Sequence, residues 1–257
     1  MKLTQHLKKT FFYKLYLALR LNIFVKFIYF FRFNFNFKSV YNNSKRISNL
    51  LLNRSTDCLI VGTGPSLDIT ELENFLRNNP KIVSFSFNSI PLLFPKSTWR
   101  PNYYCSIDPL AFNTFNTLIL PPDKITMLLS SRINTNYNNK IYFNLSYVNH
   151  LLEFLPKCIN TGIPFSHNIN KVVYDGNTVL YFTLQICFAM GFRNVHLMGI
   201  DLDYSQPRKH FINYSNTLLP SKVEIPKMIK SFEKILKVSK KLRIRLINSS
   251  SKSKLYF

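Results

Sequence analysis

The sequence predicts an α/β fold in which helices cover both faces of a mostly parallel sheet. Short apolar runs such as 58–61 and 195–200 have the continuous apolar character of strands that are buried on both faces. Segments with helical periodicity separate several of these runs, and this alternation is typical of a Rossmann-like sheet. The chain has 257 residues, of which 46% are hydrophobic, enough for one packed domain with an appendage.

The appendage is predicted at the N-terminus, where residues 1–50 form a basic aromatic helical arm and residues 51–257 form the α/β domain. Residues 1–46 contain ten Lys or Arg and no acidic residue. A cation interrupts every apolar run, which disfavours a cleaved signal peptide and a spanning helix of about 20 apolar residues. Aromatic rings that enter the headgroup layer, beside cations that reach lipid phosphates, predict a helix on an anionic membrane surface. The alternative is a helix that packs on the protein's own core.

The whole chain is basic, with 34 Lys and Arg against 12 Asp and Glu and a net charge of +22. This charge predicts an anionic partner such as nucleic acid, an acidic membrane or a phosphorylated substrate. The sequence has no recognisable RNA-binding or helix-turn-helix signature, so no nucleic-acid partner is expected. The cysteines include no CxxC pair, which disfavours metal knuckles and disulfide frameworks. Reduced core thiols in a cytoplasmic protein are predicted for Cys58, Cys105, Cys158 and Cys187.

The elements of the α/β domain are predicted in chain order from residue 57. Thr70 to Glu73 reads as a capping box that opens the first helix. Leu and Ile alternate with Arg over 242–247, which predicts a half-exposed last strand, and the Asn-rich and Ser-rich stretches 134–139 and 248–253 are predicted loops. The other predicted strands are 58–61, 81–88, 103–108, 124–130, 140–146 and 195–200, and the predicted helices are 71–78, about 177–190 and about 224–240.

The segment DCLIVGTGPSLDIT, residues 57–70, places a glycine-rich turn between the first strand and the first helix. Backbone N–H groups at such a turn are free to meet an anion, which predicts a phosphate cradle. Leu67 stands where the dinucleotide fingerprint has its third glycine, and no Gly-Lys-Ser/Thr follows, so an NAD site and a Walker A loop are disfavoured. The predicted cradle consists of Gly62, Thr63, Gly64, Pro65 and Ser66.

Polar residues also follow other predicted strands, at the edge where open α/β sheets bind their ligands. Four of the 12 acidic residues stand at such ends: Asp108, Asp175, Asp201 and Asp203. Their clustering, in a chain that otherwise avoids negative charge, predicts a site. The candidate ligand-binding residues outside the cradle are Asn88, Asp108, Asp175, Gly176, Asn177 and Thr178.

Two motifs follow the strand 195–200. Asp201-Leu202-Asp203 matches the DxD pattern by which many nucleotide-sugar enzymes hold a divalent ion. Because three-letter patterns occur by chance, a metal at Asp201 and Asp203 is an open alternative and is not favoured. His210 lies in a polar, basic loop, where a neutral imidazole can accept a hydroxyl proton near pH 7. A general base and an exposed loop histidine are therefore both open interpretations of His210.

Three blocks of the sequence together resemble a known family. They are GTGPSLD, then FSFNSIPLLFPKSTWRPNYYCSIDP (85–109), then YDGNTVLYFTLQICFAMGFRNVHLMGIDLDYS (174–205) followed by KHF (209–211). They resemble the family of unknown function 115, whose members are described as 6-hydroxymethylpterin diphosphokinase MptE-like. More distantly, they resemble the bacterial sialyltransferases of glycosyltransferase family 42. The resemblance covers about residues 57–250.

The sialyltransferase resemblance implies a GT-A-like fold, a CMP-sugar donor, no required metal, and inverting transfer with a histidine base. By position it implies that Gly62, Thr63, Gly64 and Ser66 approach the donor phosphate and ribose. It implies that Tyr204 stabilises the departing phosphate and that His210 is the base. It further implies that Asn88 holds the nucleotide and that Asn177 and Thr178 contact the base or the phosphate. The pterin-kinase resemblance implies instead ATP, magnesium at Asp108, Asp201 or Asp203, and diphosphoryl transfer.

The expected function is glycosyl transfer from a nucleotide-sugar to a glycan or glycolipid acceptor. A basic arm suits an enzyme of bacterial surface-polysaccharide or lipopolysaccharide assembly that is peripheral to the cytoplasmic face of the inner membrane. Two alternatives stay open: a 6-hydroxymethylpterin diphosphokinase-like diphosphotransferase, and a non-catalytic binding component of a polysaccharide assembly complex.

Overall fold

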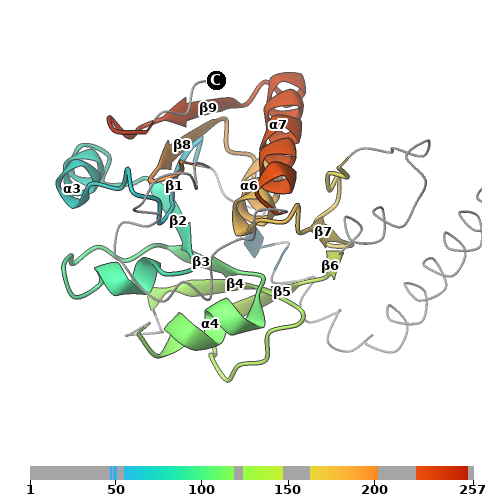
Figure 1. Ribbon diagram of the computed structural model, residues 1–257, viewed down its shortest axis with the longest axis horizontal. Helices are drawn as coiled ribbons and strands as arrows, with labels where there is room; N and C mark the ends of the chain where they lie inside the picture. The colour runs from blue at the N-terminus through green and yellow to red at the C-terminus, as the bar shows by residue number, and fades with distance from the viewer. Residues whose placement is uncertain are drawn as a thin grey trace, which may run out of the picture.

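A parallel sheet of seven strands forms the centre of the protein (Figure 1). The computed structural model describes residues 47, 49–50, 55–118, 124–146, 163–201 and 224–253. The strand order is β5-β4-β3-β2-β1-β8-β9, and every neighbouring pair is parallel. The strands are β1 (Asp57–Val61), β2 (Val83–Phe87), β3 (Tyr103–Ser106), β4 (Thr126–Ser130), β5 (Lys140–Phe143), β8 (Asn194–Met198) and β9 (Arg245–Asn248).

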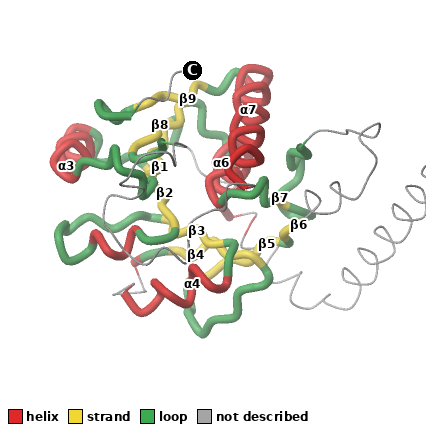
Figure 2. Tube along the Cα trace, viewed as in Figure 1, coloured by secondary structure: helices red, strands yellow, loops and turns green. Residues whose placement is uncertain are grey.

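Helices pack on both faces of this sheet, which confirms the predicted fold class (Figure 2). Successive side chains of a strand point to opposite faces, so Cys58 and Ile60 of β1 join one buried cluster while Leu59 and Val61 join the other. The first cluster includes α6 (Val179–Ala189) and α7 (Glu224–Leu242). The second includes α3 (Ile69–Asn78), η1 (Ile90–Leu93) and α4 (Pro109–Phe115).

Helix α3 begins earlier than predicted, and the predicted capping box is wrong. Its N-cap is Asp68, whose Oδ1 accepts hydrogen bonds from the backbone N–H groups of Thr70 at 2.9 Å and Glu71 at 3.3 Å. Glu73 does not turn back to the cap, because its Oε1 accepts a hydrogen bond from Ser97 Oγ at 2.8 Å. Only Leu67 and Asp68 therefore separate the glycine-rich turn from the first residue of the helix.

The predicted strand 140–146 is divided between two sheets. Its first part is β5, and its second part is β6 (Leu145–Ser146), which pairs with β7 (Val173–Tyr174) in a separate two-stranded sheet. Helix α4 was not predicted, although Asp108 and Pro109 supply an ordinary start signal. A short η2 helix (Asn116–Leu118) follows it.

The described cysteines are core residues, as predicted. Cys58, Cys105 and Cys187 are buried free thiols, and Cys158 lies outside the described residues. Burial raises the pKa of the Cys105 thiol to about 12, so this thiol is protonated at neutral pH. The three thiols therefore serve as small apolar side chains in the cluster that α6 forms with the sheet.

Most of the basic arm lies outside the described residues. Its last part is described at Ile47 and Leu50, which are buried in the same cluster as α6 and α7. Among the helices that the structure describes, none combines the length and the apolar character that crossing a bilayer requires.

Candidate functional site

The strand order reverses between β1 and β8. From β1 the chain adds β2, β3, β4 and β5 on one side, and it then returns to add β8 and β9 on the other side. In open α/β sheets, ligands bind beyond the carboxyl ends of the strands at such a switch point. The two segments at this position are residues 62–66 after β1 and residues 199–201 after β8, which we call the paired turns.

Backbone hydrogen bonds join the paired turns. The N–H of Gly62 donates to the carbonyl of Met198 at 2.8 Å, and the N–H of Gly64 donates to the carbonyl of Gly199 at 2.8 Å. The N–H of Ser66 donates to Oδ2 of Asp201 at 3.0 Å. The pairing of β1 with β8 is thus continued beyond the ends of the strands.

These bonds overturn the predicted amide cradle. The amides of Gly62, Gly64 and Ser66 are already used within the protein, and Pro65 has no N–H to offer. Among hydrogen bonds between described residues, the amide of Thr63 alone in this turn takes no part. A ligand at the switch point must therefore be held mainly by side chains.

The glycines of the paired turns allow two backbones to touch. A Cβ atom on Gly64 would collide with the carboxylate of Asp201 and lie 2.8 Å from the carbonyl oxygen of Gly199. Gly199 has a φ of +66°, and a Cβ there would lie 2.7 Å from the carbonyl oxygen of Gly62. These glycines are explained by close packing of one turn on the other, without any ligand.

Two buried serine hydroxyls at this edge have no hydrogen-bond partner among the described residues. Ser66 is 5% exposed and follows β1, and Ser89 is fully buried and follows the neighbouring β2. By contrast, Oγ of Ser86 donates to the carbonyl of Val61 at 2.7 Å. A buried hydroxyl without a partner costs about 1–3 kcal/mol, and such groups are rare in folded proteins. The two serines therefore mark this edge of the sheet as the candidate ligand site.

Two of the predicted asparagines have unusual backbone conformations. Among described residues other than glycine, three have a positive φ, and two of these are Asn88 at +53° and Asn177 at +58°. The carbonyl of Asn88 accepts a hydrogen bond from Oη of Tyr104 at 2.8 Å, which holds this conformation. Backbone strain of this kind is common at binding sites, although asparagine tolerates it better than most residues.

The predicted segment Asp175 to Thr178 forms the start of α6. Thr178 is the N-cap, and its Oγ1 accepts a hydrogen bond from the Leu180 N–H at 3.3 Å, while Asp175 is 4% exposed. A Cβ atom on Gly176 would collide with the ring of Tyr181. The next residue, Val179, lies in the same buried cluster as Phe87 at the end of β2 and Ile200 of the paired turns. The segment therefore begins a helix that packs on the same face of the sheet as these two residues.

Of the remaining predicted site residues, one caps a helix and three lie outside the described residues. Asp108 is exposed, and its Oδ1 accepts a hydrogen bond from the Leu110 N–H at 2.9 Å as the cap of α4. Asp203, Tyr204 and His210 lie outside the described residues. Within the residues that are described, no three His, Cys, Asp or Glu side chains gather so as to hold a metal ion.

Sequence reasoning missed the segment 249–253, which was predicted only as a loop. Oγ of Ser250 accepts a hydrogen bond from the Gly199 N–H at 2.9 Å, and Oγ of Ser253 donates to the carbonyl of Ile200 at 2.9 Å. Nζ of Lys252 lies 2.6 Å from Oδ2 of Asp68 in an ion pair. The segment after β9 thus braces both the paired turns and the start of α3.

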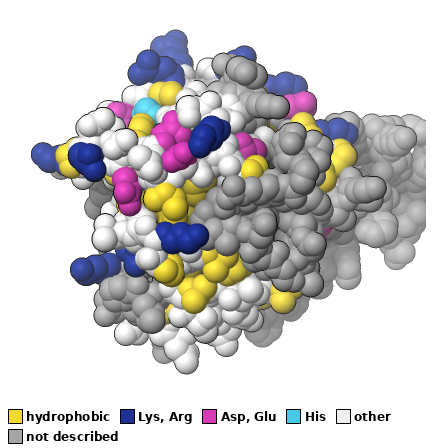
Figure 3. All heavy atoms as spheres, turned by 60° about the vertical axis from the view of Figure 1, so that its left-hand side comes forward, with side chains coloured by type: hydrophobic (Ala, Val, Ile, Leu, Met, Phe, Trp, Pro, Cys, Tyr) yellow, Lys and Arg dark blue, Asp and Glu magenta, His cyan; other side chains and the backbone are white. Residues whose placement is uncertain are grey.

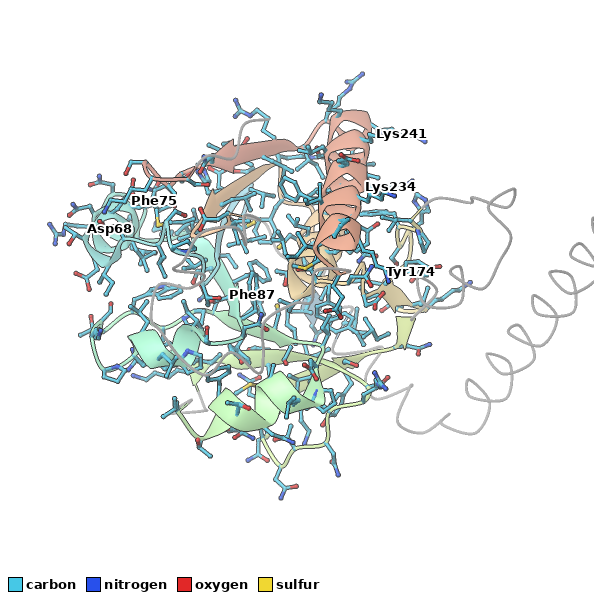
Figure 4. All side chains as sticks on the ribbon, in the orientation of Figure 1. Asp68, Phe75, Phe87, Tyr174, Lys234 and Lys241 are labelled. Atoms are coloured by element: carbon cyan, nitrogen blue, oxygen red, sulfur yellow. The ribbon has the colours of Figure 1, made fainter. Side chains whose placement is uncertain are left out.

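A groove of about 490 Å³ opens between α3 and this segment. Acidic side chains gather on the face that carries α3 (Figure 3). Figure 4 labels Asp68 and Phe75 on α3, both of which line the groove. The complete lining is Asp68, Thr70, Glu71, Asn74, Phe75, Asn78, Ser249 and Ser251.

The fold is that of an α/β protein, and the switch point at the carboxyl edge of its sheet is its candidate ligand site. The chain matches the family described as 6-hydroxymethylpterin diphosphokinase MptE-like over residues 32–207, and it belongs to this family. A search of curated protein sequences finds no match.

The solved structures with a similar fold include a glycosyltransferase. The MAf glycosyltransferase from Magnetospirillum magneticum AMB-1 is 17% identical, with a TM-score of 0.51 over 77% of this chain. The chain spans only 35% of that protein. The sialyltransferase Cst-I from Campylobacter jejuni is 15% identical, with a TM-score of 0.48 over 79% of this chain and 78% of that one. CstII from the same organism, in complex with CMP-3FNeuAc, is 15% identical, with a TM-score of 0.41 over 78% and 84% of the two chains. The chain therefore has a glycosyltransferase-like fold.

Proposed function

We propose that this protein is a glycosyltransferase that binds a nucleotide-sugar donor, of the CMP-sugar type, at the carboxyl ends of β1, β2 and β8. The observation that carries the proposal is the pair of buried hydroxyls of Ser66 and Ser89 beside the switch point, which have no hydrogen-bond partner among the described residues. A hydroxyl donates to a phosphate oxygen and also exchanges hydrogen bonds with ribose, so a nucleotide would satisfy both groups. The glycosyltransferase-like fold agrees with this ligand class.

The other roles in the proposal follow from chemistry. The side-chain amides of Asn88 and Asn177 offer both donors and acceptors, as recognition of a nucleobase requires. His210 would deprotonate the acceptor hydroxyl, and Tyr204 would stabilise the departing nucleotide phosphate. Asp201 would hold the 62–66 turn in place through Ser66, and the reaction would need no resident metal.

The proposed setting is the cytoplasmic face of a bacterial inner membrane, with the basic arm on anionic lipid. The acceptor would be a glycan or glycolipid of surface-polysaccharide or lipopolysaccharide assembly. The arm is central to this setting, because its cations and aromatic rings suit the headgroup layer.

The family description favours a second candidate, an ATP-dependent diphosphokinase acting on a pterin. A third candidate, a non-catalytic binding component, has a separate test. Alanine at His210 and Asp201 would leave its biological activity intact, whereas deletion of residues 1–46 would abolish it.

A panel of nucleotides tests the donor class directly. We expect CMP or a CMP-sugar, without metal, to raise the melting temperature by about 5–10 °C at a hundredfold excess over Kd. UDP, GDP and ATP, with and without magnesium or manganese, complete the thermal-shift panel. Stabilisation by ATP that depends on magnesium would favour the diphosphokinase instead, and stabilisation by no nucleotide would contradict both enzyme proposals.

Replacing the unpartnered serines tests where the nucleotide binds. We expect Ser66→Ala and Ser89→Ala to leave the free energy of unfolding unchanged or higher, because each removes a buried hydroxyl that has no partner. Each variant should nevertheless bind CMP at least about tenfold more weakly in calorimetry, because it loses a hydrogen bond to the ligand.

Ser86→Ala is the matched control. Its hydroxyl donates to the carbonyl of Val61, so its loss should destabilise the fold by about 1 kcal/mol and leave CMP binding unchanged. The binding site would lie elsewhere if Ser66→Ala and Ser89→Ala bound CMP like the unmodified protein.

A further inference from the structure

Helix α7 carries a row of lysines that the donor site does not use. Lys227, Lys230, Lys234, Lys237 and Lys241 follow one another at intervals of three and four residues, which places them on one stripe of the helix. Nineteen residues at 1.5 Å each make α7 about 28 Å long, so the row extends over most of this length. Figure 4 labels Lys234 and Lys241 on this helix.

The stripe faces away from the core. The buried residues of α7 lie on the other side of the helix, and Lys230, Lys237 and Lys241 are exposed. The basic surface continues past the end of α7 with exposed Arg193, whose Nη1 donates to the carbonyl of Leu242 at 3.1 Å. The buried residues are Met228, Ser231, Phe232, Ile235 and Ser239. We call the five lysines the α7 stripe.

The fold does not explain the central lysines of the α7 stripe. Lys240 and Lys241 lie in the last turn, where cations complement the negative end of the helix dipole. Lys230, Lys234 and Lys237 are too far from that end to benefit, and they form no ion pair with any residue that the structure describes. Glu233, the one acidic residue among them, makes no such pair either. Like charges three and four residues apart repel, so the stripe lowers the intrinsic stability of α7.

We propose that the α7 stripe docks on an anionic phospholipid bilayer. A straight row of cations fits a plane of lipid phosphates, and it carries no exposed aromatic ring of the kind that stacks nucleic-acid bases. Phe232, the aromatic residue of α7, is buried in the core. The exposed apolar side chains of Ile229 and Leu242, 41% and 40% exposed, lie on either side of the stripe.

The proposed contact between the α7 stripe and the bilayer is electrostatic. Because the apolar face of α7 is buried against the sheet, the helix cannot insert, and charge is the main attraction between the stripe and the bilayer. Such attraction falls off within a Debye length, about 10 Å at 0.1 M salt. The inference goes beyond the proposed transferase, since it depends on α7 and not on the donor site or on the arm.

Co-sedimentation of the full chain with phosphatidylcholine vesicles, with and without phosphatidylserine, tests this inference. We expect K230Q/K237Q/K241Q to bind the anionic vesicles at least about tenfold more weakly, because each cation near such a surface strengthens binding about fivefold. The difference between the variant and the unmodified protein should disappear at about 0.5 M salt, whereas binding through aromatic rings of the arm would persist.

The matched control is K81Q/K96Q/K171Q, which removes three exposed lysines outside α7. Equal loss of binding in both triple variants, or none in either, would overturn the inference. It would also be overturned if the α7 variant lost more affinity for a single-stranded oligonucleotide than for vesicles. Melting temperature and CMP stabilisation are measured on every variant, so a failed fold or a failed donor proposal is recognised separately.

Discussion

Gly199→Ala is expected to lower the free energy of unfolding by at least about 3 kcal/mol. The φ of Gly199 is +66°, which costs an alanine about 1 kcal/mol. The larger part comes from packing, because the new Cβ would lie 2.7 Å from the carbonyl oxygen of Gly62 and 2.9 Å from Cβ of Leu67. The hydrogen bond from Gly62 to Met198 holds that backbone in place, so the clash has no easy relief. Urea unfolding of purified protein measures the change.

Gly191→Ala separates the two contributions. Gly191 also has a positive φ, +89°, but a Cβ there would meet no atom within 4 Å. We expect a loss of about 1–2 kcal/mol from the backbone conformation alone. If Gly191→Ala and Gly199→Ala lost the same stability, close packing of the paired turns would not be the reason for a glycine at residue 199.

The fold was predictable where the sequence carries a local signal. Strands that are buried on both faces of a parallel sheet are rich in apolar residues, so β1, β2, β3, β4 and β8 stand out along the chain, with β1 and β4 as the most continuous apolar runs. The division of 140–146 depends on the pairing of β6 with β7, a distant segment of two residues that has no periodicity of its own. The predicted single strand is divided because of this tertiary pairing, which the local sequence does not encode.

The glycines of the candidate site were visible in the sequence, but the reason for them was not. A glycine signals that a backbone must approach something closely, but a phosphate and another backbone make the same demand. At Gly62 and Gly64 the neighbour is the turn after β8, which could not be read from the sequence. Ser89 was missed for a similar reason. Its sequence context is that of any buried serine, and only the folded structure shows that its hydroxyl lacks a hydrogen-bond partner among the described residues.

Replacing Asp201 is expected to change both the stability of the fold and the binding of CMP. Its Oδ2 accepts the Ser66 N–H at 3.0 Å, and this bond fixes the turn that carries the Ser66 hydroxyl. We expect Asp201→Ala to lower the free energy of unfolding by about 1–3 kcal/mol, because it leaves a partly buried N–H without its acceptor. We also expect it to abolish stabilisation by CMP, since the hydroxyl loses its position. Urea unfolding and thermal shift, measured on the same preparation, report the two effects.

Asp201→Asn distinguishes positioning from charge. The amide oxygen of asparagine can still accept the Ser66 N–H, so this variant should keep the stability and most of the CMP affinity that Asp201→Ala loses. If the carboxylate charge were itself required, for a metal ion or for proton transfer, Asp201→Asn would remain folded and be as inactive as Asp201→Ala. Retained CMP binding in Asp201→Asn, beside its loss in Asp201→Ala, would identify Asp201 as a positioning residue. It would also mean that the first aspartate of this DxD pattern acts on the turn after β1, because its carboxylate faces Ser66 across the switch point.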